Sequence, residues 1–241
     1  MKIALIILTR NERDCVEIVM PDVPAPGPGA GYDDVVVIDG GSTDGTVEWF
    51  EENDIRVVGQ QSRRGRGHAF QIAFESVEAD AYLFFSPDGN EDPADLPKFR
   101  PLLEAGNDIV IASRMMKGAH NEEDDQLIRL RKWANNAFNF MANTAFRGKH
   151  PYISDSINGY RAITKSAADR LLLDAPDYTI EYQMTMRAFQ AGLKIAEFPT
   201  NEGQRVAGDT QAHAIPTGLR FIKAFWTELR RDKSSLTDGS D

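Results

Sequence analysis

Cysteine is nearly absent from this chain of 241 residues, in which Cys15 is the only one. A single cysteine cannot form a disulfide within the chain, and this predicts a reducing compartment for the protein. The sequence also has no cluster of cysteine and histidine, which argues against a zinc site. Cys15 lies in an early apolar helical pattern, and we interpret it as part of the core.

Long hydrophobic runs are missing as well. The first apolar run, residues 3–8, is too short for a secretion signal and is not followed by a cleavage region. No uninterrupted apolar run comes near the ~20 residues needed to span a bilayer. We therefore expect a cytoplasmic protein that is soluble or peripheral on the inner face of a membrane.

Positive charge is scarce. Lysine and arginine total 27 against 37 acidic residues, so the net charge is -10. General nucleic-acid binding requires a basic face, and we therefore expect no nucleic acid among the partners. This balance leaves room for a local basic pocket that binds phosphate groups.

What the chain does have is a regular alternation of buried strands and helices. Five apolar runs are typical of strands, at residues 3–8, 34–39, 55–58, 82–85 and 108–112. Helical patterns separate most of them, which predicts right-handed crossovers and a mainly parallel sheet with helices on both faces. The length and the 41% hydrophobic content fit one α/β domain with a sizeable core.

Three of the expected strands end in polar or glycine-rich loops, after Leu8, Ile38 and Phe85. Parallel strands place these ends on one edge of the sheet, where open α/β sheets bind their ligands. The second loop is rich in glycine, which lets a backbone approach a ligand closely, and it leads into a helix start that suits an anion or a ribose. We therefore predict a nucleotide site with Asp39 and Asp88 facing each other across it.

The third of these loops reads Ser86-Pro-Asp-Gly-Asn-Glu-Asp-Pro93 and concentrates oxygen ligands directly after a buried strand. Carboxylate and amide oxygens suit Mg²⁺ or Mn²⁺, which also bind phosphates, so a metal-assisted diphosphate site is one hypothesis. The alternative is a polar loop that caps the next helix, with Asp92 as N-cap and Pro93 at the first helical position.

The remaining patterns leave further alternatives open. Three arginines in residues 63–67 can hold phosphate, or they form an ordinary basic loop. The helical pattern of residues 126–146 can frame an acceptor site or simply pack on the sheet. Residues 217–231 are amphipathic, which suits contact with a membrane surface or packing on the body, and we favour packing. Residues 232–241 are polar, and we predict disorder there.

Residues 2–211 resemble the inverting family 2 glycosyltransferases with a GT-A fold. Within that family the chain looks most similar to the group of dolichyl-phosphate mannose synthase and the polyprenyl-phosphate glycosyltransferases. The resemblance rests on the segments 6–12, 36–46, 84–93, 112–118, 155–162, 197–199 and 205–208. It implies one Rossmann-like domain with a nucleotide-sugar-binding half (residues 1–116), an acceptor-binding half (117–215) and an amphipathic C-terminal helix (216–231).

The resemblance also implies roles for individual residues. Asp39 would bind the nucleotide base, Asp88 a divalent cation, and Arg205 the diphosphate. The donor-binding residues would be Leu8, Arg10, Glu12, Asp39, Gly65, Pro87, Asp88, Asn90, Arg205 and Gln211, and the ligands of Mg²⁺ or Mn²⁺ would be Asp88 and Asn90. The acceptor-binding residues would be Arg114, Arg131, Asn135 and Ser156, because guanidinium groups match phosphate oxygens.

The implied reaction is the transfer of a sugar, with inversion, from a nucleoside-diphosphate sugar to a polyprenyl (dolichyl) phosphate. Asp88 and Arg205 would stabilise the leaving diphosphate, and an ionised phosphate acceptor needs no base. One alternative is a soluble or saccharide hydroxyl acceptor, which requires a carboxylate base, with Asp155 and Glu181 as candidates. Another is a protein that binds a nucleotide sugar without catalysis.

Three positions depart from the family pattern. Ser86 stands where the metal motif has its first aspartate, Gly40 where the nucleotide turn has its second aspartate, and Gln211 where a lysine is frequent. Ser86 removes a negative charge from the metal site, and Gln211 removes a positive charge that faces the diphosphate. The first change bears on metal dependence, and both bear on the identity of the donor.

Overall fold

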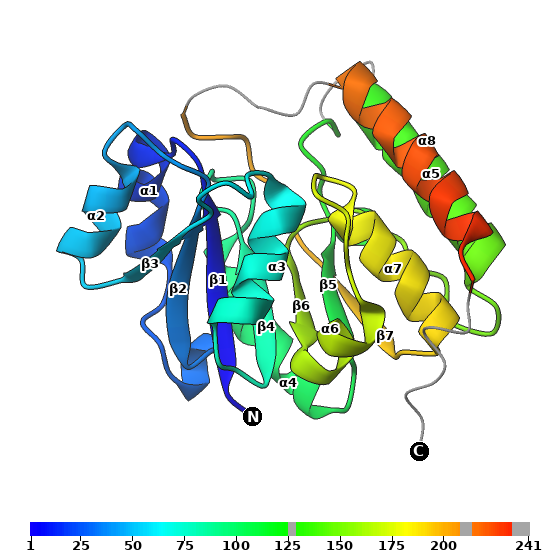
Figure 1. Cartoon of the computed structure of the whole chain (residues 1–241), viewed down its shortest axis with the longest axis horizontal. Coiled ribbons are helices and arrows are strands. Elements are labelled where there is room, and N and C mark those ends of the chain that lie inside the picture. Colours follow the sequence, from blue (N-terminus) through cyan, green and yellow to red (C-terminus); the bar gives the residue numbers. More distant parts are fainter. Residues whose placement is uncertain (125–128, 208–213, 233–241) are drawn as a thin grey trace.

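A seven-stranded sheet forms the centre of the computed structural model, which describes residues 1–124, 129–207 and 214–232. The strand order is β3-β2-β1-β4-β6-β5-β7 (Figure 1). The strands are β1 (Ile3–Thr9), β2 (Asp34–Asp39), β3 (Arg56–Gly59), β4 (Ala81–Phe85), β5 (Ile109–Ser113), β6 (Arg161–Thr164) and β7 (Ile195–Pro199). Neighbouring strands are parallel except at β6, which is antiparallel to β4 and β5. The predicted α/β class and mainly parallel sheet are confirmed.

Helices cover both faces of the sheet, because side chains of each strand alternate between two hydrophobic cores. In β1, for example, Leu5 belongs to one core and Ile6 to the other. The first core contacts α1 (Arg13–Val19), α2 (Thr46–Glu52) and α4 (Phe99–Glu104). The second contacts α3 (Arg66–Ser76), α5 (Leu130–Phe146), α6 (Lys165–Leu171), α7 (Ile180–Ala191) and α8 (Ala214–Arg230).

Short 3-10 helices complete the fold: η1 (Met20–Asp22), η2 (Pro28–Ala30) and η3 (Pro93–Lys98). The segment after β4 is η3 followed by α4 instead of one continuous helix, because Pro97 and Pro101 lack the N–H that an α-helical turn uses. Asp92 caps η3 by accepting a hydrogen bond from the N–H of Ala94 at 2.9 Å. The capping alternative for the acidic loop is therefore correct for Asp92.

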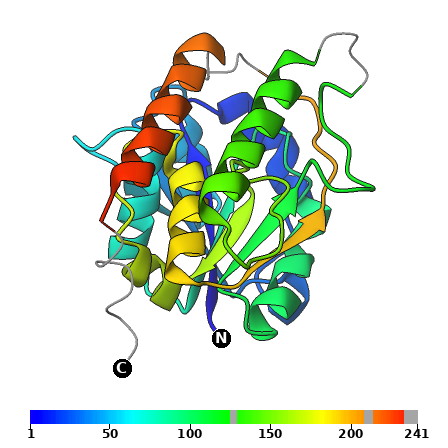
Figure 2. The same ribbon diagram turned by 90° about the vertical axis from the view of Figure 1, so that its right-hand side faces the viewer.

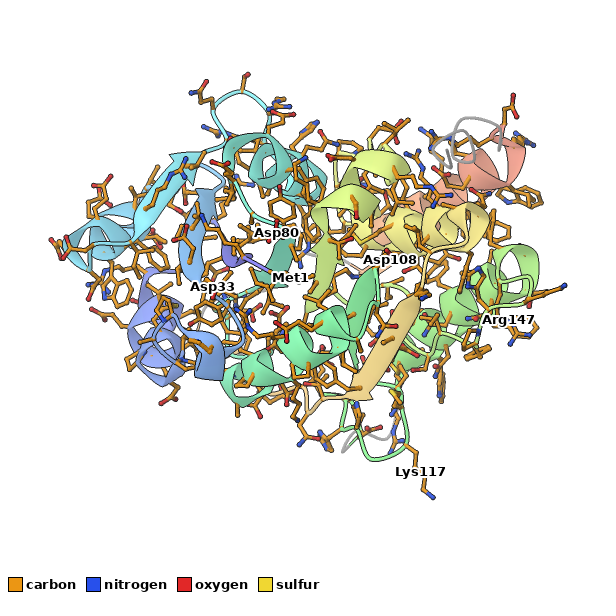
Figure 3. All side chains as sticks on the ribbon, turned by 90° about the horizontal axis from the view of Figure 1, so that it is seen from below. Met1, Asp33, Asp80, Asp108, Lys117 and Arg147 are labelled. Atoms are coloured by element: carbon orange, nitrogen blue, oxygen red, sulfur yellow. The ribbon has the colours of Figure 1, made fainter. Side chains whose placement is uncertain are left out.

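Three aspartates lie at the edge of the sheet at which β2, β4 and β5 begin. Asp33, Asp80 and Asp108 lie just before these strands, and Figure 3 labels all three on this edge together with Met1. Their carboxylates accept hydrogen bonds from the backbone N–H groups of Ile3, Lys2 and Lys194, at 2.8, 2.6 and 2.7 Å. These side chains satisfy the sheet's own backbone, which leaves the opposite edge for a site.

The α5 and α8 helices lie side by side on the outside of the molecule (Figure 2). They contact each other through stacked rings of Phe138 and Phe221, whose centroids are 5.0 Å apart. Phe221 and Phe225 of α8 are buried, so the predicted packing of this helix on the body is confirmed. No helix in the described ranges combines the length and the apolar character needed to cross a bilayer. The tail predicted to be disordered lies outside the described residues, except for Asp232.

Candidate active site

Two adjoining cavities open at the edge where β1, β2 and β4 end. The first has a volume of about 490 Å³ and the second about 310 Å³. Four residues line both cavities: Arg66, Ser86, Asp88 and Tyr178. The register of the parallel strands explains the location, because Ile7 of β1 pairs with Phe85 of β4 and Thr9 with Asp39 of β2. The loops that follow these strands therefore start at the same level along the strand direction.

The first cavity gathers most of the residues predicted to bind the donor. These are Leu8, Arg10, Glu12, Gly65, Pro87, Asp88 and Arg205. Four segments far apart in the sequence supply them, namely the end of β1 with the loop after it, the N-cap of α3, the loop around residue 88 and the loop around residue 205. Gln211, which was also predicted to bind the donor, lies outside the described residues.

Asp39 is oriented differently from the prediction. Its side chain is 3% exposed and does not line the first cavity. The carboxylate accepts hydrogen bonds from the N–H groups of Gly41 and Ser42, at 2.7 and 2.9 Å, and from the hydroxyl of Thr9 at 3.2 Å. The expectation that Asp39 faces Asp88 across the site is thus not met. Hydrogen-bond donors from the turn after β2 and from Thr9 hold the Asp39 carboxylate in place.

Arg205 connects the loop after β7 to both sides of the first cavity. Its guanidinium forms an ion pair with Glu12, and its Nη1 lies 3.3 Å from Oδ2 of Asp88. Burial raises the pKa of Asp88 and of Glu12, and the charge of Arg205 opposes both shifts. The pairing of Arg205 with Glu12 was not predicted, since 193 residues separate the two in the sequence.

Backbone contacts hold the segment of residues 201–207 against the loop after β4. The N–H of Gly203 donates to the carbonyl of Asn90 at 2.9 Å, and the N–H of Val206 donates to the carbonyl of Asp88 at 3.0 Å. Gly89 has φ +91°, and a Cβ added there would meet Cγ1 of Val206 at 2.5 Å. A glycine is therefore needed for this close approach.

Oxygen atoms suited to a divalent cation gather at the border of the two cavities. Asp88 lines both cavities, and Asn90 and Glu91 line the second. The Oδ1 atom of Asn90 is buried and has no hydrogen-bond partner within the described part of the chain. Burial raises the pKa of Glu91 to about 8.

These oxygens fit a hard cation that takes only part of its coordination from the protein. No group of three or more histidine, cysteine, aspartate or glutamate side chains within the described ranges could hold a metal by itself. Mg²⁺, however, is usually bound by one or two carboxylates, with water and substrate phosphates as its other ligands. An aspartate and an unpartnered amide oxygen, beside a cavity with room for phosphate groups, meet that requirement.

The second cavity brings together three of the residues predicted to bind the acceptor, which are Arg114, Arg131 and Asn135. Apolar side chains of α5 and α8 form its outer wall, including Leu130, Phe138 and Phe221. Arg131 is half-exposed at the rim, where it forms an ion pair with Glu122. The second cavity is thus lined by charged groups and by apolar side chains of two helices.

Asp155 and Ser156 do not line either cavity. Asp155 is fully buried and accepts hydrogen bonds from Nε and Nη2 of Arg114, at 2.8 and 3.0 Å. Ser156 is also fully buried, and both its hydroxyl and its N–H donate to Oδ1 of Asn139. Their positions are those of residues that orient Arg114 and α5, because a group that contacts substrate needs access to the cavity.

Two residues of the site lie in stretches noted in the sequence but were given no individual role. Arg66, the first residue of α3, forms an ion pair with Glu181, and its Nη1 lies 3.3 Å from the hydroxyl of Ser86. Gly159 makes room for it, since a Cβ there would lie 1.9 Å from Nη2 of Arg66. Glu91, the other residue, lies within the acidic motif itself.

Known proteins share the sequence and the fold. The family model described as "Glycosyl transferase family 2" matches residues 5–169. "Glycosyltransferase AglJ" of Haloferax volcanii is 32% identical over 232 residues, which cover 92% of this chain and 71% of the relative. "Undecaprenyl-phosphate mannosyltransferase" of Micrococcus luteus is 27% identical over 248 residues, which cover 95% of this chain and 98% of the relative.

A solved structure of similar fold is glucosyl-3-phosphoglycerate synthase from Mycobacterium tuberculosis in complex with Mn²⁺, uridine diphosphate and phosphoglyceric acid. It matches with a TM-score of 0.73 at 20% identity, and the match covers 97% of this chain and 80% of that one. The strand order, the site at the carboxyl edge and these matches agree. The chain belongs to glycosyltransferase family 2 and is a glycosyltransferase with the GT-A fold.

Proposed function

We propose that the protein transfers a sugar, with inversion, from a nucleoside-diphosphate sugar to a polyprenyl phosphate. The observation that carries the proposal is the pair of cavities that share Arg66 and Asp88, the second of which is lined both by charged groups and by apolar side chains of α5 and α8. A lipid phosphate has the charged head and apolar chain that suit such a lining. The Micrococcus luteus relative, an undecaprenyl-phosphate mannosyltransferase by name, supports the acceptor class.

In this mechanism the leaving diphosphate occupies the first cavity beside Arg10 and Arg205. Their charges stabilise the negative charge that develops as the sugar–phosphate bond breaks. A divalent cation held by Asp88 and Asn90, Mg²⁺ or Mn²⁺, would supply further charge neutralisation on the diphosphate. The similar glucosyl-3-phosphoglycerate synthase was crystallised with Mn²⁺, which supports this choice of ion. Asp39 would then contribute to the base pocket through the turn that it holds in place.

On the acceptor side, Arg131 and Arg114 would attract the phosphate, and Asn135 would orient it. An ionised phosphate oxygen attacks the sugar without a general base. A hydroxyl acceptor needs a base instead, and of the two candidates, Asp155 and Glu181, only Glu181 lines the second cavity. Glucosyl-3-phosphoglycerate synthase was crystallised with phosphoglyceric acid, a soluble molecule, so a soluble acceptor is the alternative to test.

The test is a donor screen followed by a transfer assay. A donor that binds only the folded chain at 100 times its dissociation constant adds about 2.7 kcal/mol of stability, so the melting midpoint should rise by roughly 5–10 °C for the true nucleotide sugar with Mg²⁺ or Mn²⁺. The radiolabelled sugar should then appear on polyprenyl phosphate. Transfer only to a free saccharide would establish the hydroxyl acceptor instead, and binding without any transfer would contradict catalysis.

Replacing Arg131 by alanine should raise the KM for polyprenyl phosphate about tenfold or more, because a charge-assisted hydrogen bond contributes roughly 1.5–3 kcal/mol. The KM for the donor should change less than twofold. Steady-state kinetics with each substrate varied in turn measure both values. Arg147→Ala, near the far end of α5, is the matched control and should leave both unchanged. An effect of Arg131→Ala on the donor alone would refute the acceptor assignment.

We further propose peripheral membrane contact through residues 217–231. One side of α8 exposes Leu219, Ile222, Trp226 and Leu229, and the neighbouring helix α5 exposes Trp133 and Phe140. The side chains of Lys223 and Arg230, also exposed, suit anionic headgroups. Apolar side chains in this arrangement would bring the second cavity close to a lipid acceptor.

Substituting Trp226 by aspartate should lower the fraction bound to anionic phospholipid vesicles about tenfold, since it removes roughly 1–2 kcal/mol of apolar burial. Co-sedimentation measures the bound fraction. Ile18→Asp changes an equally exposed apolar residue on α1 and should leave binding unaltered. Equal binding of both variants and the unchanged protein would remove this surface from the proposal.

A further inference from the structure

The backbone after β4 turns back on itself and brings Glu91 to Ser86. Oε2 of Glu91 accepts a hydrogen bond from the N–H of Ser86 at 2.7 Å. The turn between them contains Gly89 in the left-handed region, with φ +91°. A carboxylate therefore lies beside the position at which the family motif has an aspartate and this chain has a serine.

The carboxylates around this position differ in how their charge is balanced. Glu12 is paired with Arg205, and Glu181 is paired with Arg66. Asp88 shares Arg205 at 3.3 Å. No lysine or arginine in the described part of the chain lies within ion-pair distance of Glu91. Its carboxylate lines the second cavity and can act as a ligand for a cation that enters there.

A second observation places an additional oxygen there. Asn90, between Asp88 and Glu91, has a buried Oδ1 without a hydrogen-bond partner in the described part of the chain. Leaving such an atom unpaired costs free energy, and a bound cation removes that cost. Asn90 and Glu91 line the same cavity as Asp88.

We propose that Glu91 supplies the second carboxylate of the divalent-cation site begun by Asp88 and Asn90, in place of the carboxylate that Ser86 lacks. The inference rests on the proposed function, in which a cation accompanies the donor diphosphate. The backbone N–H of residue 86, which does not depend on the serine side chain, positions the Glu91 carboxylate. Compared with the family motif, this chain thus has one carboxylate after the turn, at Glu91, instead of directly after β4, at position 86.

The experiment is Mn²⁺ binding to the full chain, followed by the loss of the electron paramagnetic resonance signal of free Mn²⁺. Glu91→Gln should weaken Mn²⁺ binding at least tenfold, and Asp88→Asn should do the same. Glutamine keeps an oxygen that can accept the Ser86 N–H, so this substitution removes the charge and retains the hydrogen bond. Glu52→Gln, at the exposed end of α2, is the control and should have no effect.

The double variant Ser86→Asp/Glu91→Gln restores a carboxylate at the family position and should recover binding to within about threefold of the unchanged protein. Weak binding by Asp88→Asn with normal binding by Glu91→Gln would overturn the role of Glu91 and leave the proposed function intact. Loss in Glu91→Gln without recovery in the double variant would also overturn it. Normal binding by all variants, or none by the unchanged protein, would overturn the cation site of the proposed function as well. Thermal unfolding of each variant establishes that it is folded.

Discussion

Replacing Asp88 by asparagine should lower the turnover number for sugar transfer at least 100-fold while the chain remains folded. Asp88 lines both cavities, and its carboxylate is the only acidic side chain in the described residues that does so. In the proposed function Asp88 would hold the cation that stabilises the leaving diphosphate, and loss of such charge stabilisation in the transition state typically costs about 10²–10³ in rate. Asparagine has almost the same shape as aspartate, so a loss of activity measures the contribution of the negative charge.

The measurement is single-turnover transfer at saturating donor, because saturation separates the chemical step from donor binding. Asp92→Asn is the matched control, since Asp92 caps η3 and asparagine caps a helix equally well. Its activity should stay within twofold of the unchanged protein. Equal rates for Asp88→Asn and the control would exclude Asp88 from the reaction.

Replacing Glu228 by alanine should lower the free energy of unfolding by about 3–5 kcal/mol. Glu228 and Arg187 form an ion pair between α8 and α7 in which both side chains are almost completely buried, at 1% and 3% exposure. Oε1 of Glu228 also accepts a hydrogen bond from Gln183 at 2.8 Å. Breaking this pair leaves the buried guanidinium with only the exposed Asp174, among the described residues, as counter-charge, and this is the main cost.

Urea unfolding followed by circular dichroism measures this change. The control is Glu75→Ala, which breaks the exposed pair between Arg63 and Glu75 and should cost less than about 1 kcal/mol. The double variant Arg187→Met/Glu228→Leu removes both charges and should recover a large part of the lost stability. A loss below about 1 kcal/mol for Glu228→Ala would show that the buried pair contributes little to holding α8 on the body.

The sheet could be predicted because its strands are nearly continuous apolar runs. Residues 3–8 and 82–85, for example, are buried on both faces, and strands of this kind consist almost entirely of apolar residues. The antiparallel direction of β6 could not be predicted from its four residues. Strand direction depends on the path of the chain through α5 and the segment before β6, which no local pattern records.

The location of the site followed from the same logic, but the orientation of its side chains did not. Asp39 and Asp88 both follow strands that end at one edge, yet one carboxylate turns into its own loop and the other into the cavities. Asp155 looked like a candidate base and is instead the buried partner of Arg114. The pairing of Arg66 with Glu181 joins residues 115 positions apart, and only the packed structure brings them together.

The position of Arg205 between Glu12 and Asp88 has a thermodynamic consequence for ligand binding. One guanidinium cannot neutralise Asp88 and a bound diphosphate to the same extent at the same time. A diphosphate that attracts Arg205 leaves Asp88 with more negative charge, which strengthens its attraction for a cation. By linkage the cation must strengthen diphosphate binding by an equal factor. If the proposed diphosphate and cation bind here, the ion pairs around Arg205 thus make their binding cooperative.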